Sequence, residues 1–282
     1  MNVQIDHVTV CGRDLDRMRQ TFAEAGLTTV YGGPHANGLT HMALVGFDDG
    51  SYLELIAPLN GGNQRALEGA SGMMAGWLPL MLGDAGAAAW AIRADRIHET
   101  AERLRQQGIA IFGPERGGRK KPDGTQLEWE TALLGRGPAG SVLPFMIEDR
   151  TERSLRIQPS TSAREAGIRG MAAVILAVHD LSATAALFQK AFSVDSPSLG
   201  EDFDLKARLA HFRGTPVILA TPVQSSSPIQ LRLDRFGEGP MGFVFSGTWK
   251  EPSARTSQWF GQQLRWFKEK PGTGLLGMLD AS

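Results

Sequence analysis

The segment GSYLELIAP, residues 50–58, has the pattern of a β-strand that follows a tight turn. Side chains alternate between the two faces of a strand, so Tyr52, Glu54 and Ile56 share one face and apolar residues occupy the other. A lone buried carboxylate is unfavourable by several kcal/mol unless it is paired or coordinated. Glu54 therefore predicts one of two arrangements: its face is exposed to solvent, or the carboxylate has a functional role in a cavity.

The residues before this strand complete a unit with the order strand, helix and three strands. Alternating β-branched residues indicate the first strand, apolar residues at helical spacing indicate the helix, and DDG (48–50) indicates a hairpin. The predicted elements are VQIDHVTVCG (3–12, strand), RDLDRMRQTFAEAGL (13–27, helix), TTV (28–30, strand), GGPHANG (32–38, loop), LTHMALVGF (39–47, strand) and SYLELIA (51–57, strand).

The same order of elements recurs along the chain. A second unit covers about 86–149, with the loop PERGGRKKPDG at 114–124, and a third starts near 170. From about 228, IQLRL (229–233) and GFVFSG (242–247) resemble strands, and SARTSQWFGQQLRWF (253–267) resembles a helix. This last part is interpreted as a fourth, degenerate unit that lacks its hairpin.

Such repeats decide the fold class more than any single motif does. Repeated β-α-β-β-β units predict an α+β protein whose curved antiparallel sheets surround a cavity, with the helices outside. The polar stretch RTERSLRIQPSTSAREAG, residues 150–167, has no apolar period and predicts a break in the chain. The expected domains are therefore 1–150 and 165–282, the second being degenerate.

Composition limits the classes of function. The chain has 282 residues, of which 42% are hydrophobic and 21% charged, and its formal net charge is −1. Acids and bases are mixed, so neither nucleic acid nor a membrane is an expected partner. The single cysteine, Cys11, excludes an internal disulfide, and the N-terminus lacks the pattern of a signal peptide. The cytoplasm is the expected location.

Four segments, in this order, resemble the glyoxalase-like domain of the vicinal oxygen chelate superfamily. They are IDHVTVCGRDLDRM (5–18), DGSYLELIA (49–57), KPDGTQLEWETA (121–132) and LPFMIED (143–149). This superfamily includes glyoxalases, extradiol dioxygenases, fosfomycin-modifying transferases and bleomycin-binding proteins. The resemblance implies a cavity, usually with a divalent metal held by residues from the first and last strands of two paired units.

Carried over to this chain, the resemblance implies His7 and Glu54 as metal ligands from the first unit. In the second unit the first-strand position falls near Ala89, which cannot bind a metal, and the last strand offers Glu148. One imidazole and two carboxylates suit zinc, iron, manganese, cobalt or nickel. The third unit has Ala173 and Ile218 at these positions, so the second domain is expected to serve packing, dimer contact or closure.

Further candidates lie around this expected site. His41 is a candidate for acid–base catalysis together with Glu54, or it makes a structural hydrogen bond. Trp90 and Trp129 either provide aromatic walls for a substrate or pack in the core. Arg119 either reaches an anionic substrate at the cavity mouth or belongs to a solvated loop.

These expectations converge on a metal-dependent enzyme of the lyase, isomerase or dioxygenase type that acts on a small oxygen-rich or aromatic substrate. The alternative is a protein that binds and sequesters a small molecule or drug without turnover and without need of a metal. A metal-free isomerase or lyase that uses His41 is a third hypothesis. Exposed strand edges make a homodimer an expectation as well.

Overall fold

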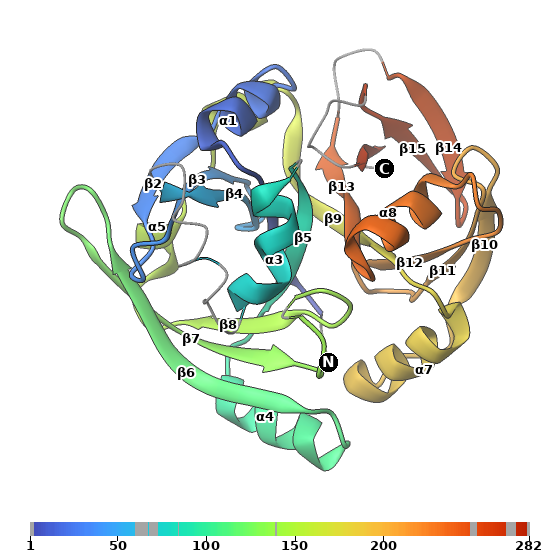
Figure 1. Cartoon of the computed structure of the whole chain (residues 1–282), viewed down its shortest axis with the longest axis horizontal. Coiled ribbons are helices and arrows are strands. Elements are labelled where there is room, and N and C mark those ends of the chain that lie inside the picture. Colours follow the sequence, from blue (N-terminus) through green and yellow to red (C-terminus); the bar gives the residue numbers. More distant parts are fainter. Residues whose placement is uncertain are drawn as a thin grey trace.

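The computed structural model describes residues 3–59, 67, 73–83, 85–138, 140–248, 253–268 and 275–280. Its strands form two eight-stranded sheets, which lie beside each other (Figure 1). Helices pack on both sheets, so the predicted α+β class with repeated units is confirmed. None of the described helices is long and apolar enough to span a membrane.

The N-terminal sheet contains the first two units. Its strands are β1 (Ile5–Cys11), β2 (Val30–Pro34), β3 (Thr40–Gly46), β4 (Tyr52–Pro58), β5 (Gly86–Arg93), β6 (Ile111–Lys120), β7 (Gln126–Leu134) and β8 (Phe145–Asp149). Their order is β2-β3-β4-β1-β5-β8-β7-β6, which places the first strands of both units, β1 and β5, side by side at the centre. In each unit the first strand pairs in parallel with the last, β1 with β4 and β5 with β8.

The C-terminal sheet repeats this topology. Its strands are β9 (Ile168–Ala177), β10 (Ser198–Asp202), β11 (Ala207–His211), β12 (Val217–Pro222), β13 (Gly239–Gly247), β14 (Arg255–Trp259), β15 (Gln262–Trp266) and β16 (Leu275–Asp280). The order is β10-β11-β12-β9-β13-β16-β15-β14, with β9 parallel to β12 and β13 parallel to β16. The two sheets therefore have the same arrangement of strands.

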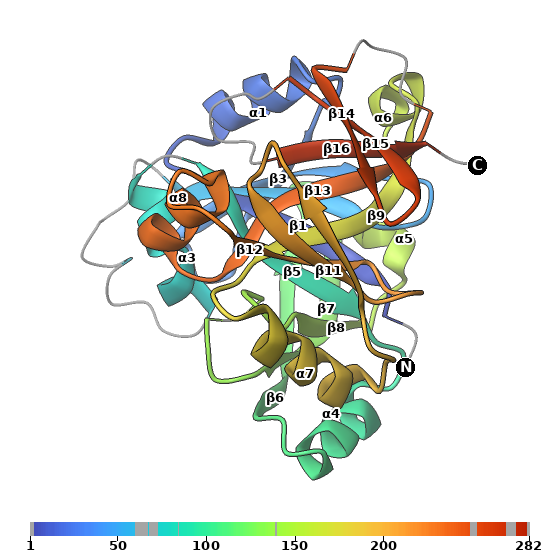
Figure 2. The same cartoon turned by 90° about the vertical axis from the view of Figure 1, so that its right-hand side faces the viewer.

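One core lies between the two sheets. Val8 and Trp90 of the N-terminal sheet and Val174 and Leu176 of the C-terminal sheet belong to the same buried cluster. The apolar faces of α1 (Leu15–Ala23), α4 (Ile97–Gln106) and α7 (Leu181–Phe192) extend it. Figure 2 shows α1 at one end of the molecule and α4 and α7 at the other. These three helices lie outside the sheets, as predicted.

Each sheet presents its other face to a separate cluster. On the N-terminal sheet, α3 (Met73–Leu82) packs Trp77, Leu80 and Met81 against this face. On the C-terminal sheet, α8 (Pro228–Phe236) packs Ile229 and Leu233 in the corresponding place. Two short helices, α5 (Arg153–Arg156) and α6 (Thr161–Glu165), lie in the predicted break between the sheets. The domain boundary itself stays a prediction.

The predictions for the C-terminal region are wrong in two respects. Residues 229–233, expected as a strand, lie in α8, where Pro228 occupies the first turn and Ser227 caps the helix. Residues 253–267, expected as a helix, contain the hairpin β14–β15. Phe260 and Gly261 both adopt positive φ angles, the backbone of a tight hairpin turn that a helix cannot include. The fourth unit thus has a hairpin after all.

Two predicted loops are also shorter than expected. Residues 114–120 continue β6 instead of forming a loop, because this segment pairs with β7 as far as Lys120 opposite Gln126. Similarly, Gly32–Pro34 belong to β2. The longer β6 places Arg119 on a strand, where its side chain has a fixed direction.

Candidate functional site

A cavity of about 550 Å³ opens on the face of the N-terminal sheet that carries α3. Its polar wall comes from the first unit, with His7 on β1, Glu54 on β4 and His35 directly after β2. Its opposite wall comes from the second unit, with Trp129 on β7 and Phe145 on β8. The cavity therefore lies between the two units, as the repeats predict.

His7 is held by the residue before it. Its Nδ1 atom lies 2.8 Å from Oδ1 of Asp6, which is fully buried. Burial alone would raise the pKa of Asp6, but Arg156, His7 and Arg153 together hold it below its usual value. An ionised carboxylate only accepts hydrogen bonds, so Nδ1 of His7 carries the proton. In the neutral ring Nε2 is then free to bind a cation or accept a proton, and it faces Glu54 at 3.8 Å.

Glu54 lies between two imidazoles. Its Oε2 atom is 3.8 Å from Nε2 of His7, and its Oε1 atom is 3.8 Å from Nε2 of His35. Thr9 donates a long hydrogen bond of 3.5 Å to Oε2. Burial raises the pKa of this carboxyl group, but His35, His7 and Arg119 lower it by more, so the carboxylate stays ionised. The exposed-face interpretation of Glu54 is wrong, because the residue is 9% exposed and lines the cavity.

His35 is the site residue that the sequence did not reveal. It was interpreted as part of a loop, and it does start the turn between β2 and β3. Its backbone N–H donates to the Thr40 carbonyl at 2.8 Å, and its Nδ1 atom lies 2.7 Å from the Thr40 hydroxyl. These two contacts fold the turn back, so that Nε2 points at Glu54. A histidine directly after a strand that pairs with the Glu54 hairpin is the only signal in the sequence.

A network of ion pairs lies next to His7 and Glu54. Arg156 is buried and donates to Asp6, Asp149 and the Tyr52 hydroxyl. The ring of Tyr52 stacks on His7 with 4.6 Å between centroids. Arg153 donates to both Asp6 and Asp149. This network fixes His7 from behind and from one side.

The second unit is apolar at the equivalent positions. His7 pairs with Tyr52, and in the second unit Ala91 pairs with Phe145 in the same way. Two residues after Tyr52 stands Glu54, and two residues after Phe145 stands Ile147. The register thus places Ala91, rather than Ala89, at the first-strand position. The conclusion that this position cannot bind a metal is the same.

Glu148 is not brought to His7 and Glu54. Phe145 and Ile147 line the cavity, and the alternation of β8 turns Glu148 to the opposite face. There its carboxylate accepts from the backbone N–H of Ile97 at 2.8 Å and from Arg150 at 3.0 Å. It caps the start of α4, so the structure does not support its expected role as a metal ligand.

His41 and Trp90 also lie away from the cavity. Thr40 and Met42 line it, whereas the His41 ring makes an edge contact with Tyr31. Burial lowers the pKa of His41. Trp90 is fully buried between the sheets, stacked on Phe188, and its indole N–H donates to the Val142 carbonyl. The expected catalytic role of His41 and the expected wall role of Trp90 are therefore not supported.

Trp129 and Arg119 do line the cavity. Trp129 lies over Gly117 of β6, where a Cβ atom would stand 2.6 Å from the indole nitrogen. Trp77 of α3, which the sequence analysis did not single out, adds a second indole to the wall. Its buried N–H has no hydrogen-bond partner in the described part of the chain.

The carboxylate oxygens of Glu54 and the Nε2 atoms of His7 and His35 are of the types that bind divalent metals. Across residues 3–59, 67, 73–83, 85–138, 140–248, 253–268 and 275–280, no three His, Cys, Asp or Glu side chains stand in the arrangement of a formed metal site. Two ligands with bonds of about 2.1 Å to one ion stand roughly 3.0–3.4 Å apart. The 3.8 Å gaps beside Glu54 exceed this slightly, so the side chains would have to move closer together to hold an ion. Two imidazoles and a carboxylate are a common set for transition metals.

Comparison with known proteins identifies the family. A family model described as a glyoxalase-like domain matches residues 5–192, two thirds of the chain. This chain belongs to the glyoxalase-like domain family. No curated protein matches it.

Solved structures share the fold of this glyoxalase-like protein. A hypothetical protein from Staphylococcus aureus is 13% identical, with a TM-score of 0.67 over 99% of this chain and 100% of that one. The Mn(II)-bound glyoxalase from Novosphingobium aromaticivorans is 11% identical, with a TM-score of 0.54 over 98% and 81%. The 2,2',3-trihydroxybiphenyl 1,2-dioxygenase from Sphingomonas wittichii is 11% identical, with a TM-score of 0.54 over 100% and 91%. The family model confirms the predicted glyoxalase-like domain, and these structures confirm its fold.

Proposed function

We propose that this glyoxalase-like protein is a metal-dependent enzyme that acts on a small oxygen-rich substrate in the cavity of the N-terminal sheet. The main support is the Glu54 carboxylate, which lies between the Nε2 atoms of His7 and His35, 3.8 Å from each. Within the described residues this buried carboxylate has one long hydrogen bond and two facing imidazoles, which are the surroundings of a ligand rather than of a structural group.

His7, His35 and Glu54 would hold the metal. Bound there, a divalent ion would supply Lewis acidity toward adjacent substrate oxygens and would stabilise negative charge that develops on them. The Mn(II)-bound glyoxalase with the same fold is consistent with such an ion. The set leaves coordination positions for substrate, because only three ligands come from the protein.

The other residues prepare the cavity for this chemistry. Asp6 fixes the tautomer and the direction of His7. The indole ring of Trp77 adds to the apolar lining of the cavity. Phe145, whose ring meets that of His7 edge-on with 5.3 Å between centroids, and Ile147 form an apolar wall beside the proposed ligands.

Metal binding tests the proposal without knowledge of the substrate. Protein purified without chelating resin is analysed for bound metals, and Mn²⁺ or Zn²⁺ is then titrated into metal-free wild type, Glu54→Gln, His35→Asn and His7→Ala. We expect a single site in wild type and a loss of affinity above about hundredfold in each variant, since each removes a ligand. His41→Asn is the matched control, because His41 lies on the same hairpin outside the cavity. The site would be refuted if Glu54→Gln, His35→Asn and His7→Ala all bound metal as tightly as wild type and the His41→Asn control.

The second candidate function is sequestration of a small molecule without turnover. The apolar residues Ala91 and Ile147 favour it, because they stand where a second pair of ligands would be expected. A thermal-shift screen of metabolites and antibiotics, with and without metal, separates the two functions. Stabilisation by the same compounds regardless of metal supports sequestration, and stabilisation that needs the metal supports the enzyme.

A further inference from the structure

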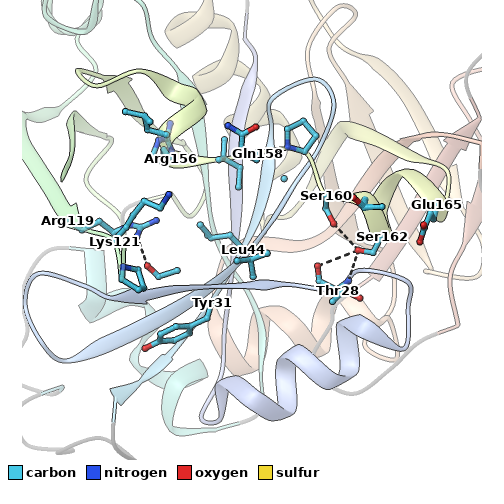
Figure 3. Close-up of a pocket in the computed structure, with 18 residues that line it drawn as sticks. Thr28, Tyr31, Leu44, Arg119, Lys121, Arg156, Gln158, Ser160, Ser162 and Glu165 are labelled. Atoms are coloured by element: carbon cyan, nitrogen blue, oxygen red, sulfur yellow. Dashed lines mark hydrogen bonds between the residues drawn. The ribbon is translucent and has the colours of Figure 1, made fainter. Parts of the chain in front are cut away.

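A second cavity, of about 610 Å³, adjoins the first. Three residues line both cavities: Leu44, Arg119 and Arg156. Figure 3 shows the second cavity with Arg119 and Lys121 at one end. The hydroxyl side chains of Thr28, Ser160 and Ser162 lie at the other end (Figure 3). The cationic end is the one that meets the metal-binding cavity.

Arg119 is the unusual residue of this junction. It is 6% exposed, and its guanidinium makes one hydrogen bond, to the Gly32 carbonyl. No carboxylate in the described residues forms an ion pair with it. A guanidinium has five N–H donors, so most of its donors lack a protein acceptor. None of these donors is among the buried atoms that lack a partner, and Arg119 lines both cavities, so its guanidinium can meet an anion there.

The neighbouring cations do not share this property. Arg156, equally buried, is paired with Asp6 and Asp149. Lys121 pairs with Asp123 at 3.2 Å. Arg119 is therefore the cation of the junction that is left to meet a ligand.

Glu54 does not serve as the missing partner. The charge of Glu54 acts on Arg119 only at a distance, and burial lowers the pKa of Arg119 more than Glu54 raises it. The carboxylate oxygens of Glu54 face His7 and His35 instead. Glu165, the acid that lines the second cavity, is exposed and lies among the hydroxyl groups at its far end (Figure 3).

We propose that one extended organic anion occupies both cavities, with its carboxylate or phosphate group on Arg119 and a polar tail among Thr28, Ser160 and Ser162. The proposal rests on the proposed function, since it assigns the reacting end of that substrate to the cavity of His7 and Glu54. It favours an anionic substrate over a compact neutral one, because only an anion uses the donors that Arg119 presents to the cavities.

The test measures the binding of two simple anions, inorganic phosphate and malonate, to the metal-loaded protein by calorimetry. Wild type is compared with Arg119→Gln, Arg119→Lys and the control Arg96→Gln, whose side chain is 76% exposed and lines neither cavity. We expect Arg119→Gln to weaken binding at least about tenfold. Arg119→Lys should weaken it less, because lysine keeps the positive charge but cannot make the two parallel hydrogen bonds of a guanidinium. Arg96→Gln should bind as wild type does.

The two anions distinguish the possible sources of charge. Binding of phosphate that depends on Arg119 assigns a phosphate group, and such binding of malonate assigns a carboxylate. Glycerol 3-phosphate then tests the tail: Ser162→Ala should reduce its advantage over inorganic phosphate. Wild-type protein that binds neither anion, or Arg119→Gln that binds both normally, would overturn the proposal.

Metal titration of the same variants separates this proposal from the proposed function. We expect Arg119→Gln to keep its metal binding, with an affinity equal to or above that of wild type, because the change removes a positive charge that acts on Glu54 but removes no ligand. If Glu54→Gln abolishes anion binding while Arg119→Gln preserves it, the anion lies on the metal and the second-cavity proposal fails. If metal binding fails in wild type but anion binding still depends on Arg119, the metal site fails and the assignment of Arg119 holds.

Discussion

The two sheets have the same topology but opposite interiors. In the N-terminal sheet Thr9 of β1 pairs with Glu54, and at the corresponding place of the C-terminal sheet Ile175 of β9 pairs with Ile218. Two residues earlier on the first strand, His7 corresponds to Ala173. Ala173 and Ile218 are buried in an apolar cluster with Trp259 and Trp266, which fill the space that is a cavity in the other sheet. Polar side chains line a cavity on the N-terminal sheet, whereas apolar side chains form a second core at the corresponding face of the C-terminal sheet.

A pair of buried carboxylates shows how the two interiors differ. Asp202 of the C-terminal sheet accepts from the Leu205 N–H at 2.7 Å, from the Trp259 indole at 2.7 Å and from Ser257 at 2.9 Å. Glu54 has one hydrogen bond, of 3.5 Å, and two imidazoles at 3.8 Å. A satisfied carboxylate maintains structure, whereas an under-satisfied one beside a cavity is available for a ligand.

The largest effect on stability is expected from the network beneath the site. Asp6→Asn removes the fully buried one of the two carboxylates that Arg153 and Arg156 share, and leaves only Asp149 to balance both cations. Removing one partner of a buried ion pair costs about 3–5 kcal/mol. Urea unfolding should show this loss, with Arg96→Gln, in an exposed pair with Glu99, as a control near zero. A loss below about 1 kcal/mol would show that the network is not what holds His7.

Two tryptophan substitutions test whether the interior of the C-terminal sheet is packed and that of the N-terminal sheet is a cavity. Trp266→Ala empties a fully packed position in the C-terminal sheet and should cost about 3–5 kcal/mol in unfolding free energy. Trp129→Ala enlarges an existing cavity and removes a half-buried ring, so its cost should be about half of that or less. Equal losses would contradict the difference between the two interiors.

The two carboxylates should respond in opposite ways. Asp202→Asn should lower the unfolding free energy by about 1–3 kcal/mol, because it disrupts three hydrogen bonds, and should leave metal affinity unchanged. Glu54→Gln should change stability by less than about 1 kcal/mol and abolish metal binding. Paired unfolding and metal titrations of both variants check this, and a reversed pattern would exchange the roles assigned to the two groups.

The smallest effect concerns the contact between the N-terminal sheet and the following segment. Asp48 accepts hydrogen bonds from Arg164 and Arg169, which lower its pKa. Its contribution to the free energy of unfolding is therefore present above the usual pKa of an aspartate and is lost as the pH falls below that value. Because the contact is exposed, Asp48→Ala should cost at most about 1 kcal/mol at pH 7. Comparing urea unfolding of wild type and variant at pH 7 and pH 3 measures this, and a difference that is larger at pH 3 would contradict it.

The sequence predicted the part of the site that follows from strand order and alternation. His7 and Glu54 were located because each stands at a defined place on the first and last strand of one unit. Glu148 and Trp90 were assigned to the cavity face wrongly, because a strand whose exact register is unknown can be off by one residue, and one residue reverses the face. The register had to come from the structure, which pairs Ala91 with Phe145.

His35 and the C-terminal hairpin were out of reach for a different reason. His35 reaches Glu54 through the fold of a turn that is held by two contacts with Thr40, and no periodicity encodes such a contact. In residues 253–267, apolar spacing favoured a helix, while the positive φ angles at Phe260 and Gly261 make a hairpin. Tertiary pairing with β16 decides that segment.

The central claim is that His7, His35 and Glu54 together bind one divalent metal. Anomalous diffraction from crystals grown with Mn²⁺ tests it most directly. The account predicts one strong peak, about 2.0–2.2 Å from Nε2 of His7, Nε2 of His35 and a Glu54 oxygen. No peak in this cavity, or a peak that touches His7 and Glu54 without His35, would contradict it.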